Sequence, residues 1–280
     1  MTVPTSRLPS FVIIGAVKAA TTWTGNQLRA QPNLFLPEQE PHYFSSAFDR
    51  GPGWYASLFA AAEPGQLVGE KSADYLAHPL AASRLASMIP DARLVVQLRN
   101  PIERAYSDYC MLYRRGTVDG RIDQYLTRGS AQPRFLNDGL YGQHLARFAD
   151  RFPQEQLQIV LYDDVRRAPE ATLEAIGRHI GTPTVPVPVA PDERRNDSRA
   201  PLLPLGLRRT LQPLKRTVAP FRRRAWFQRL HAGLARPIDY PQLRPDLRLR
   251  LRDFYAADVE SLGTLLRRDL GSWLAVEQSR

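Results

Sequence analysis

Hydrophobic residues fall into short runs separated by longer stretches of mixed polarity. Short runs rich in β-branched residues predict buried strands, and they occupy residues 11–15, 68–71, 93–98 and 156–161. Helical patterns follow or precede them at about 21–31, 81–88, 101–109, 144–152, 169–180 and 245–270. Strands that alternate with helices predict an α/β fold: one central parallel sheet flanked by helices on both faces, in three layers.

Two loops of this predicted sheet are the first candidates for a binding site, because ligands of parallel sheets lie beyond the carboxyl ends of the strands. The loop after Ile14 reads GAVKAATT over residues 15–22. Small residues before a helix let backbone N–H groups approach an anion, and Lys18 with the following threonines adds charge and donors. The lysine register differs from a Walker A loop, which has Lys directly before Ser or Thr. An ordinary strand-to-helix turn with a solvated lysine is the alternative.

The second loop follows Leu98 and reads RNPIERAYS over residues 99–107. Arg99 lies at the carboxyl end of a predicted strand, and Ser107 lies about two helical turns later. An arginine fork and a hydroxyl suit a terminal phosphate. The alternative is an arginine that caps the strand and a serine on a solvated helix face.

Composition narrows the class of protein. With 280 residues, 43% of them hydrophobic, the chain has enough apolar sequence for one large domain. The single cysteine excludes an internal disulfide framework and a multi-cysteine zinc site. No apolar run reaches the roughly 18–20 residues that a membrane span needs, and the first residues lack a secretory signal pattern. We therefore expect a cytoplasmic protein.

The net charge of +10 comes from one segment. Nine basic residues and no acidic residue lie between 203 and 236, which leaves 29 basic and 28 acidic residues elsewhere. We expect one domain over 1–280, with a basic, partly irregular insertion at about 192–244 and a closing C-terminal helix. Three interpretations of 203–236 stay open: a solvated or lid-like face, contact with an acidic acceptor such as a glycan, or peripheral contact with a membrane surface.

Four motifs in fixed order give the chain a specific resemblance. Gly-x-x-Lys-small-small-Thr-Thr-Trp at 15–23 and Arg-Asn-Pro-x-x-Arg-Ala-x-Ser at 99–107 resemble the phosphate sites of sulfotransferases that use 3′-phosphoadenosine 5′-phosphosulfate (PAPS). The segments 40–44 (EPHYF) and 70–75 (EKSADY) are similar to segments of one branch, the heparan-sulfate sulfotransferases and their bacterial relatives. The resemblance covers about residues 10–180.

This resemblance implies a P-loop-like three-layer sandwich, PAPS as co-substrate and no required metal. It also implies which residues bind the nucleotide. Arg99 and Ser107 would hold the 3′-phosphate. The 5′-phosphosulfate loop would consist of Lys18, Ala19, Ala20, Thr21, Thr22 and Trp23. Ala20 stands where glycine is commoner in the family, so we expect a slightly altered loop that still binds.

The resemblance also assigns catalytic roles. Glu40 would take the proton of the acceptor, Lys18 would neutralise charge on the bridging oxygen, and Lys71 would face the sulfonate or the acceptor. His42 is the alternative base, or else a substrate contact or a packed core histidine. Glu70 is a rival base, but on a strand its side chain should point opposite to that of Lys71. Structural alternatives are a surface position for Glu40 and an ion pair of Lys71 with Glu70 or Asp74.

We therefore expect transfer of a sulfuryl group to a hydroxyl, less readily an amine, of a small-molecule or glycan acceptor. Two other classes remain open. A P-loop-type kinase or NTPase would use Asp163 or Asp164 for Mg²⁺, although the lysine register is wrong for it. A non-enzymatic, basic nucleic-acid-binding module would explain the charge but neither phosphate loop, so we expect no nucleic-acid partner. The sequence leaves the oligomeric state and the acceptor undetermined.

Overall fold

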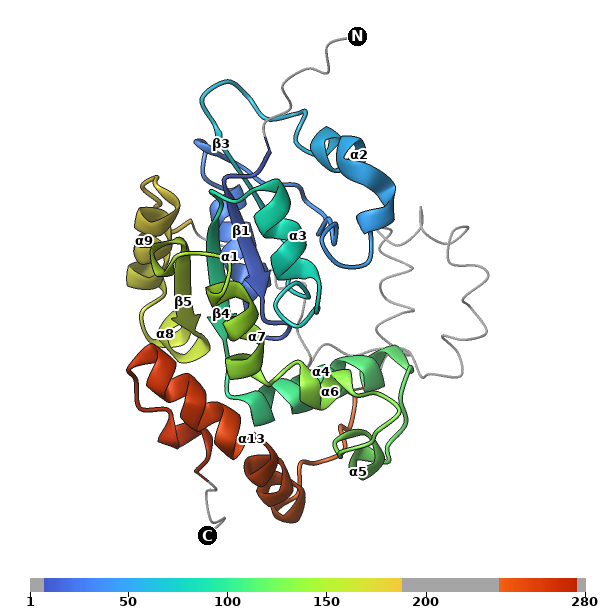
Figure 1. Ribbon diagram of the computed structural model, residues 1–280. Coiled ribbons are helices and arrows are strands. Elements are labelled where there is room, and N and C mark those ends of the chain that lie inside the picture. Colours follow the sequence, from blue (N-terminus) through green and yellow to red (C-terminus); the bar gives the residue numbers. More distant parts are fainter. Residues whose placement is uncertain (1–7, 188–236, 276–280) are drawn as a thin grey trace.

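A computed structural model describes residues 8–187 and 237–275 of the chain. Its centre is a five-stranded sheet in the order β2-β3-β1-β4-β5, in which all four neighbouring pairs are parallel (Figure 1). The strands are β1 (Phe11–Gly15), β2 (Leu34–Phe35), β3 (Leu67–Lys71), β4 (Arg93–Leu98) and β5 (Leu157–Leu161). After β1, the next two strands along the chain, β2 and β3, lie on one side of β1. The last two, β4 and β5, lie on its other side. In parallel sheets with such a reversal, ligands commonly bind beyond the carboxyl ends of the strands at this point.

Helices cover both faces of the sheet, which gives the predicted three layers. The described helices are α1 (Thr21–Arg29), η1 (Phe48–Arg50), α2 (Gly51–Ser57), α3 (Ala81–Met88), α4 (Pro101–Arg115), α5 (Ile122–Tyr125), α6 (Arg134–Asn137), α7 (Tyr141–Ala149), η2 (Gln154–Gln156), α8 (Tyr162–Arg167), α9 (Pro169–Ile180), α13 (Pro245–Leu266) and η5 (Gly271–Trp273).

The alternation of side chains along the strands divides the core in two. Phe11 and Ile13 of β1 pack with Leu28 of α1 on one face. Val12 and Ile14 point to the other face, into the larger cluster that α3, α4, α7 and α13 complete. Because β1 is covered on both sides, all five of its residues are buried. A fully apolar run without alternation is the pattern expected of such a strand.

The predicted α/β fold with a central parallel sheet is confirmed. The strands at 11–15 and 93–98 and the helices at 81–88 and 169–180 have the predicted bounds. The helix predicted to reach about residue 31 ends at Arg29, and the closing helix ends at Leu266. The two-residue strand β2 and the short helices α2, α5, α6 and α8 were not predicted. A strand of two residues shows no alternation, and a helix of four to seven residues has at most about two turns in which to show its period.

The basic segment 203–236 lies outside the described residues, as does most of the predicted insertion at 192–244. Its described end, 237–244, contains neither helix nor strand and leads into α13. α13 packs against α7 and α4. In the part of the chain that the structure describes, no helix is both long enough and apolar enough to cross a bilayer.

Candidate functional site

The loop between β1 and α1 has the backbone of an anion-binding turn. Lys18 and Ala20 both adopt left-handed conformations, with φ of +71° and +67°. The Ala16 N–H donates to the Gln97 carbonyl of β4 over 2.7 Å, which fixes the loop to the next strand. No side chain caps α1 at Ala20. The first turn of α1, with Thr21 and Thr22, therefore presents backbone N–H groups and a positive dipole end at the sheet edge.

Arg99 lies directly against this loop, although 81 residues separate it from Lys18. Its guanidinium donates to the Lys18 carbonyl oxygen over 3.4 Å. The Tyr162 ring lies beneath it, 4.8 Å from the guanidinium carbon. The Tyr141 hydroxyl donates to the Arg99 carbonyl over 2.9 Å. Asn100 caps α4 through its side-chain oxygen and donates to the carbonyl of Trp273. The two loops singled out in the sequence thus form one surface.

Lys18 and Arg99 are two cations of this surface, and the surroundings of Lys18 lower its pKa. Burial lowers the pKa of Lys18, and the nearby Arg99 lowers it further, whereas Asp108 acts in the opposite direction. The Asp108 carboxylate is itself engaged, because Arg134 donates to both of its oxygens over 3.0–3.1 Å. Ser107 is half-buried on α4, two turns after Arg99. Two neighbouring cations in a partly buried setting favour binding of an anion at this surface.

Glu40 and Lys71 form an ion pair beside α1. The Lys71 ammonium donates to Glu40 Oε1, and the Ala73 N–H donates to Glu40 Oε2 over 3.0 Å. The Lys71 stem crosses α1 at Gly25, where a Cβ would lie 3.0 Å from Lys71 Cδ. Gly25 therefore leaves room for Lys71 next to the helix that begins with the phosphate loop. The expected structural partners of Lys71, Glu70 or Asp74, were wrong, because the loop at 40 folds over the end of β3.

Glu70 points to the opposite face of β3, as predicted from strand alternation. It is fully buried and accepts hydrogen bonds from the hydroxyls of Tyr55 (2.7 Å), Tyr75 (3.2 Å) and Ser72 (3.2 Å). Burial raises its pKa from an ordinary value of 4.5 to about 7, and these hydrogen bonds offset part of the rise. Glu70 therefore lies in a closed polar cluster within the core, away from Lys71.

His42 and Asp74 form a second pair on the same side as Glu40. His42 Nδ1 lies 2.7 Å from Asp74 Oδ1, and the Ser45 hydroxyl donates to Asp74 Oδ2 over 2.6 Å. The His42 side chain is 40% exposed, so the expectation of a packed core histidine was wrong. The hydrogen bond to Asp74 raises the pKa of His42, while burial opposes the rise.

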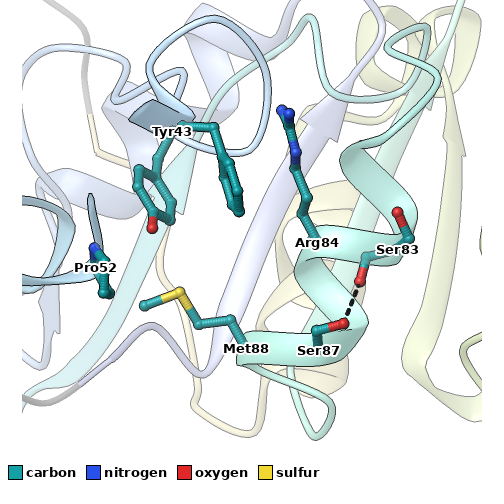
Figure 2. A pocket seen from close by; sticks show the side chains of 7 residues that line it. Tyr43, Pro52, Ser83, Arg84, Ser87 and Met88 are labelled. Atoms are coloured by element: carbon teal, nitrogen blue, oxygen red, sulfur yellow. Dashed lines mark hydrogen bonds between the residues drawn. The ribbon is translucent and has the colours of Figure 1, made fainter. Parts of the chain in front are cut away.

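The residue after His42 lines a separate pocket. Tyr43 stacks on Tyr55 with ring centroids 4.4 Å apart, and Arg84 lies 4.0 Å from the centre of the Phe48 ring. Arg84 also donates to the carbonyls of Phe44 and Ser45, which braces the loop that carries His42. Figure 2 shows Tyr43 and Arg84 above Met88 of α3. The pocket of about 380 Å³ is lined by Tyr43, Phe48, Pro52, Ser83, Arg84, Ser87 and Met88.

Sequence reasoning missed several residues of the site. Tyr162 follows β5, so the rule that ligands gather beyond strand carboxyl ends could have singled it out. Gly25 carries no sequence signal for its role, because the contact with Lys71 depends on helix packing. Asp74 was noted only as a possible partner of Lys71. Trp23, expected at the nucleotide loop, is half-buried and packs against the α1 side of the core.

Two further observations concern metal chemistry. Among residues 8–187 and 237–275, no three His, Cys, Asp or Glu side chains are grouped so that they could hold a metal ion. Asp164, the acid considered for Mg²⁺, receives two hydrogen bonds of 2.8 Å from Arg268. That carboxylate is thus engaged in an ion pair on the surface.

Comparison with known proteins agrees with this geometry. Residues 50–186 match the sequence profile of the sulfotransferase family. The chain is 34% identical over 161 residues to heparan sulfate glucosamine 3-O-sulfotransferase 6 of Mus musculus, a match that covers 52% of this chain and 44% of that protein. It is 29% identical over 201 residues to the bifunctional heparan sulfate N-deacetylase/N-sulfotransferase 1 of Caenorhabditis briggsae, covering 64% of this chain and 23% of that protein.

The fold has a close counterpart among solved structures. A sulfotransferase from Alicyclobacillus acidocaldarius superposes with a TM-score of 0.71 at 24% identity, over 96% of this chain and all of that chain. Its fold is therefore the fold of this protein. The matched part spans less than half the length of the curated relatives named above. The chain is thus similar in sequence to sulfotransferases over about half its length, and it shares the fold of a solved sulfotransferase.

Proposed function

We propose that the chain transfers a sulfuryl group from PAPS to a hydroxyl, less readily an amine, of a carbohydrate or secondary-metabolite acceptor. One observation carries the proposal most: the Arg99 guanidinium lies against the Lys18 turn. Two anion-binding elements that are far apart in sequence can then contact one doubly phosphorylated nucleotide. The sequence similarity to sulfotransferases supports the same reaction class.

The residues present fit such a nucleotide. The N–H groups of the left-handed turn at Lys18 and Ala20, with the hydroxyls of Thr21 and Thr22, would hold its 5′-phosphate. Arg99, supported by the Tyr162 ring, and Ser107 would hold the 3′-phosphate. PAPS supplies an activated sulfuryl group when bound. The half-buried Lys18 ammonium would stabilise the negative charge that develops on the leaving phosphate oxygen.

The acceptor would enter on the side of Glu40 and His42. Glu40 accepts hydrogen bonds from Lys71 and Ala73 in the structure, and each carboxylate oxygen keeps a further lone pair. It can therefore take the acceptor proton while Lys71 holds it in place. Lys71 packs on α1 at Gly25, so one side chain links the acceptor side to the phosphate loop. Such positioning favours in-line attack.

The proposed class of acceptor rests on the names of the similar proteins. Those named above act on heparan sulfate according to their names, which supports a carbohydrate acceptor for this chain. Contact with an acidic acceptor or a membrane surface through 203–236 remains a prediction, because that segment lies outside the described residues.

Calorimetric titration of the protein with 3′-phosphoadenosine 5′-phosphate, with ATP·Mg²⁺ and with an oligonucleotide tests the nucleotide assignment. We expect micromolar or tighter binding of 3′-phosphoadenosine 5′-phosphate and at least tenfold weaker binding of the other two. Tighter binding of ATP·Mg²⁺ would favour a kinase or NTPase, and tighter binding of the oligonucleotide would favour a nucleic-acid-binding module.

Transfer of label from [³⁵S]PAPS to an extract of the source organism tests the reaction itself. We expect a labelled product that requires active protein, and its digestion by glycosidases identifies a carbohydrate acceptor. Tight nucleotide binding without any labelled product would reduce the proposal to nucleotide binding.

A further inference from the structure

His42 is held at both its backbone and its ring. Its backbone adopts a left-handed conformation with φ of +51°, which histidine tolerates better than most residues. The His42 N–H donates to the Ser72 hydroxyl over 3.0 Å, and the Ser45 hydroxyl lies 3.0 Å from the His42 carbonyl oxygen. The ring meets Asp74 through Nδ1. Contacts from β3's following turn and from the loop itself thus fix the imidazole.

Asp74 is built to receive hydrogen bonds. Burial alone would raise the pKa of Asp74, but the hydrogen bonds from His42 and Ser45 outweigh it and hold that pKa below its ordinary value. The carboxylate is therefore ionised near neutral pH and can only accept hydrogen bonds. A short contact of 2.7 Å with His42 then requires the proton of the neutral imidazole to be on Nδ1.

The other ring nitrogen follows from this proton position. In the neutral imidazole Nε2 carries a lone pair, and no partner for it is found among residues 8–187 and 237–275. The His42 side chain is 40% exposed. The other charged groups that act on His42 are Glu40 of the loop and Glu70 of β3, both acids, and Glu40 is paired with Lys71.

We propose that Asp74 is a positioning residue that fixes His42 as the Nδ1–H tautomer and thereby keeps Nε2 as a hydrogen-bond acceptor for the acceptor's attacking hydroxyl. This inference rests on the proposed sulfuryl transfer for its purpose, but not for its geometry. His42 orients the hydroxyl, and Glu40 receives its proton. In the bound acceptor the hydroxyl donates its one hydrogen to Nε2. As its oxygen forms the bond to sulfur and the bond from sulfur to the leaving phosphate oxygen breaks, that proton passes to Glu40.

Nitrogen NMR of the ¹⁵N-histidine-labelled protein tests the tautomer directly. His42→Gln identifies the signals of His42 among the five histidines. We expect an Nδ1-protonated tautomer in the wild-type protein and a titration midpoint above that of an unperturbed histidine. In Asp74→Asn we expect the midpoint to fall and Nε2 to become protonated, because an amide nitrogen can donate to Nδ1. Asp164→Asn, which removes a surface carboxylate from its ion pair with Arg268, should change neither.

The wild-type spectrum alone can overturn the inference: an Nε2-protonated His42 would contradict it even if Asp74→Asn did not fold. An unchanged titration midpoint in a folded Asp74→Asn would do the same, because the charge that raises the pKa of His42 is then absent. If the [³⁵S]PAPS assay yields product, Asp74→Asn should lower its rate at least tenfold with unchanged binding of 3′-phosphoadenosine 5′-phosphate, and a wild-type rate would refute the positioning role. If wild type yields no product, the proposed function fails while the spectra still decide the pairing of His42 with Asp74.

Discussion

The two sides of the site treat charge differently. On the proposed nucleotide side, the Arg99 guanidinium donates to the backbone carbonyl of Lys18, and neither side chain forms an ion pair within the described residues. On the proposed acceptor side, the functional side chains are paired: the Lys71 ammonium with Glu40, and the His42 ring with the Asp74 carboxylate. Unpaired cations attract an anionic ligand, whereas paired groups hold one another in position. The contrast suggests that one side binds and the other orients.

Removing the charge of Glu40 should have the largest effect: it should lower turnover and leave nucleotide binding nearly unchanged. Glu40→Gln keeps the size of the side chain and an oxygen for Ala73 but loses the proton acceptor. General-base catalysis contributes roughly 10²–10⁴-fold, so we expect kcat to fall at least about 100-fold. Binding of 3′-phosphoadenosine 5′-phosphate, measured by calorimetry, should change less than about threefold.

Glu38→Gln, an exposed position in the same loop, is the matched control and should leave turnover within about twofold. Near-normal turnover of Glu40→Gln with intact nucleotide binding would show that the base is another residue.

The buried carboxyl group of Glu70 should affect how the stability of the protein depends on pH. Its pKa rises on folding from 4.5 to about 7. The folded state therefore binds the proton more tightly, and this stabilisation is complete below pH 4.5 and is lost as pH rises through about 7. At about 1.4 kcal/mol per pKa unit, up to roughly 3 kcal/mol is lost between pH 4.5 and 8.

Glu70→Gln should remove that part of the pH dependence, measured as the difference in unfolding free energy between wild type and variant at several pH values. Glu174→Gln, on the exposed face of α9, should not change the profile. A wild-type-like pH dependence in Glu70→Gln would mean that Glu70 is ionised in the folded protein.

Arg99→Ala should selectively weaken binding of nucleotides that carry a 3′-phosphate. A charge-assisted hydrogen bond contributes roughly 1.5–3 kcal/mol, so we expect a 10- to 100-fold rise in Kd for 3′-phosphoadenosine 5′-phosphate. Ser107→Ala should act in the same direction with a smaller effect. Binding of adenosine 5′-phosphosulfate, which lacks the 3′-phosphate, should change little.

Arg178→Ala removes an exposed arginine of α9 and serves as the control for net charge. Equal losses for both nucleotides in Arg99→Ala would remove the 3′-phosphate role from Arg99.

The smallest expected effect concerns the strained turn. Ala20 adopts φ of +67°, where a Cβ is disfavoured and glycine is not. Ala20→Gly should raise the unfolding free energy by about 0.5–1 kcal/mol, since relief of the left-handed strain exceeds the entropy that glycine adds to the unfolded chain. Chemical denaturation measures it. Ala19→Gly, at a buried position without positive φ, should destabilise instead.

More of the proposed nucleotide side than of the proposed acceptor side could be predicted from the sequence. On the nucleotide side, local patterns located β1, the start of α1, β4 and α4, and the parallel-sheet rule brought Lys18 and Arg99 to one edge. On the acceptor side, the motifs at 40–44 and 70–75 named the residues but not their partners. Lys71 was expected to pair with Glu70 or Asp74, and the structure pairs it with Glu40. The role of every site residue stays a prediction until the variants are measured.

The sequence by itself determined the four longer strands, the longer helices and the opposite directions of Glu70 and Lys71, because periodicity and strand alternation are properties of neighbouring residues. Tertiary structure decided which charges meet. Glu40 reaches Lys71 across 31 residues, and His42 reaches Asp74 across 32, because β1 separates β3 from β4 and a loop folds back over the end of β3. Such contacts depend on how the chain crosses the sheet, and no local spacing records that path.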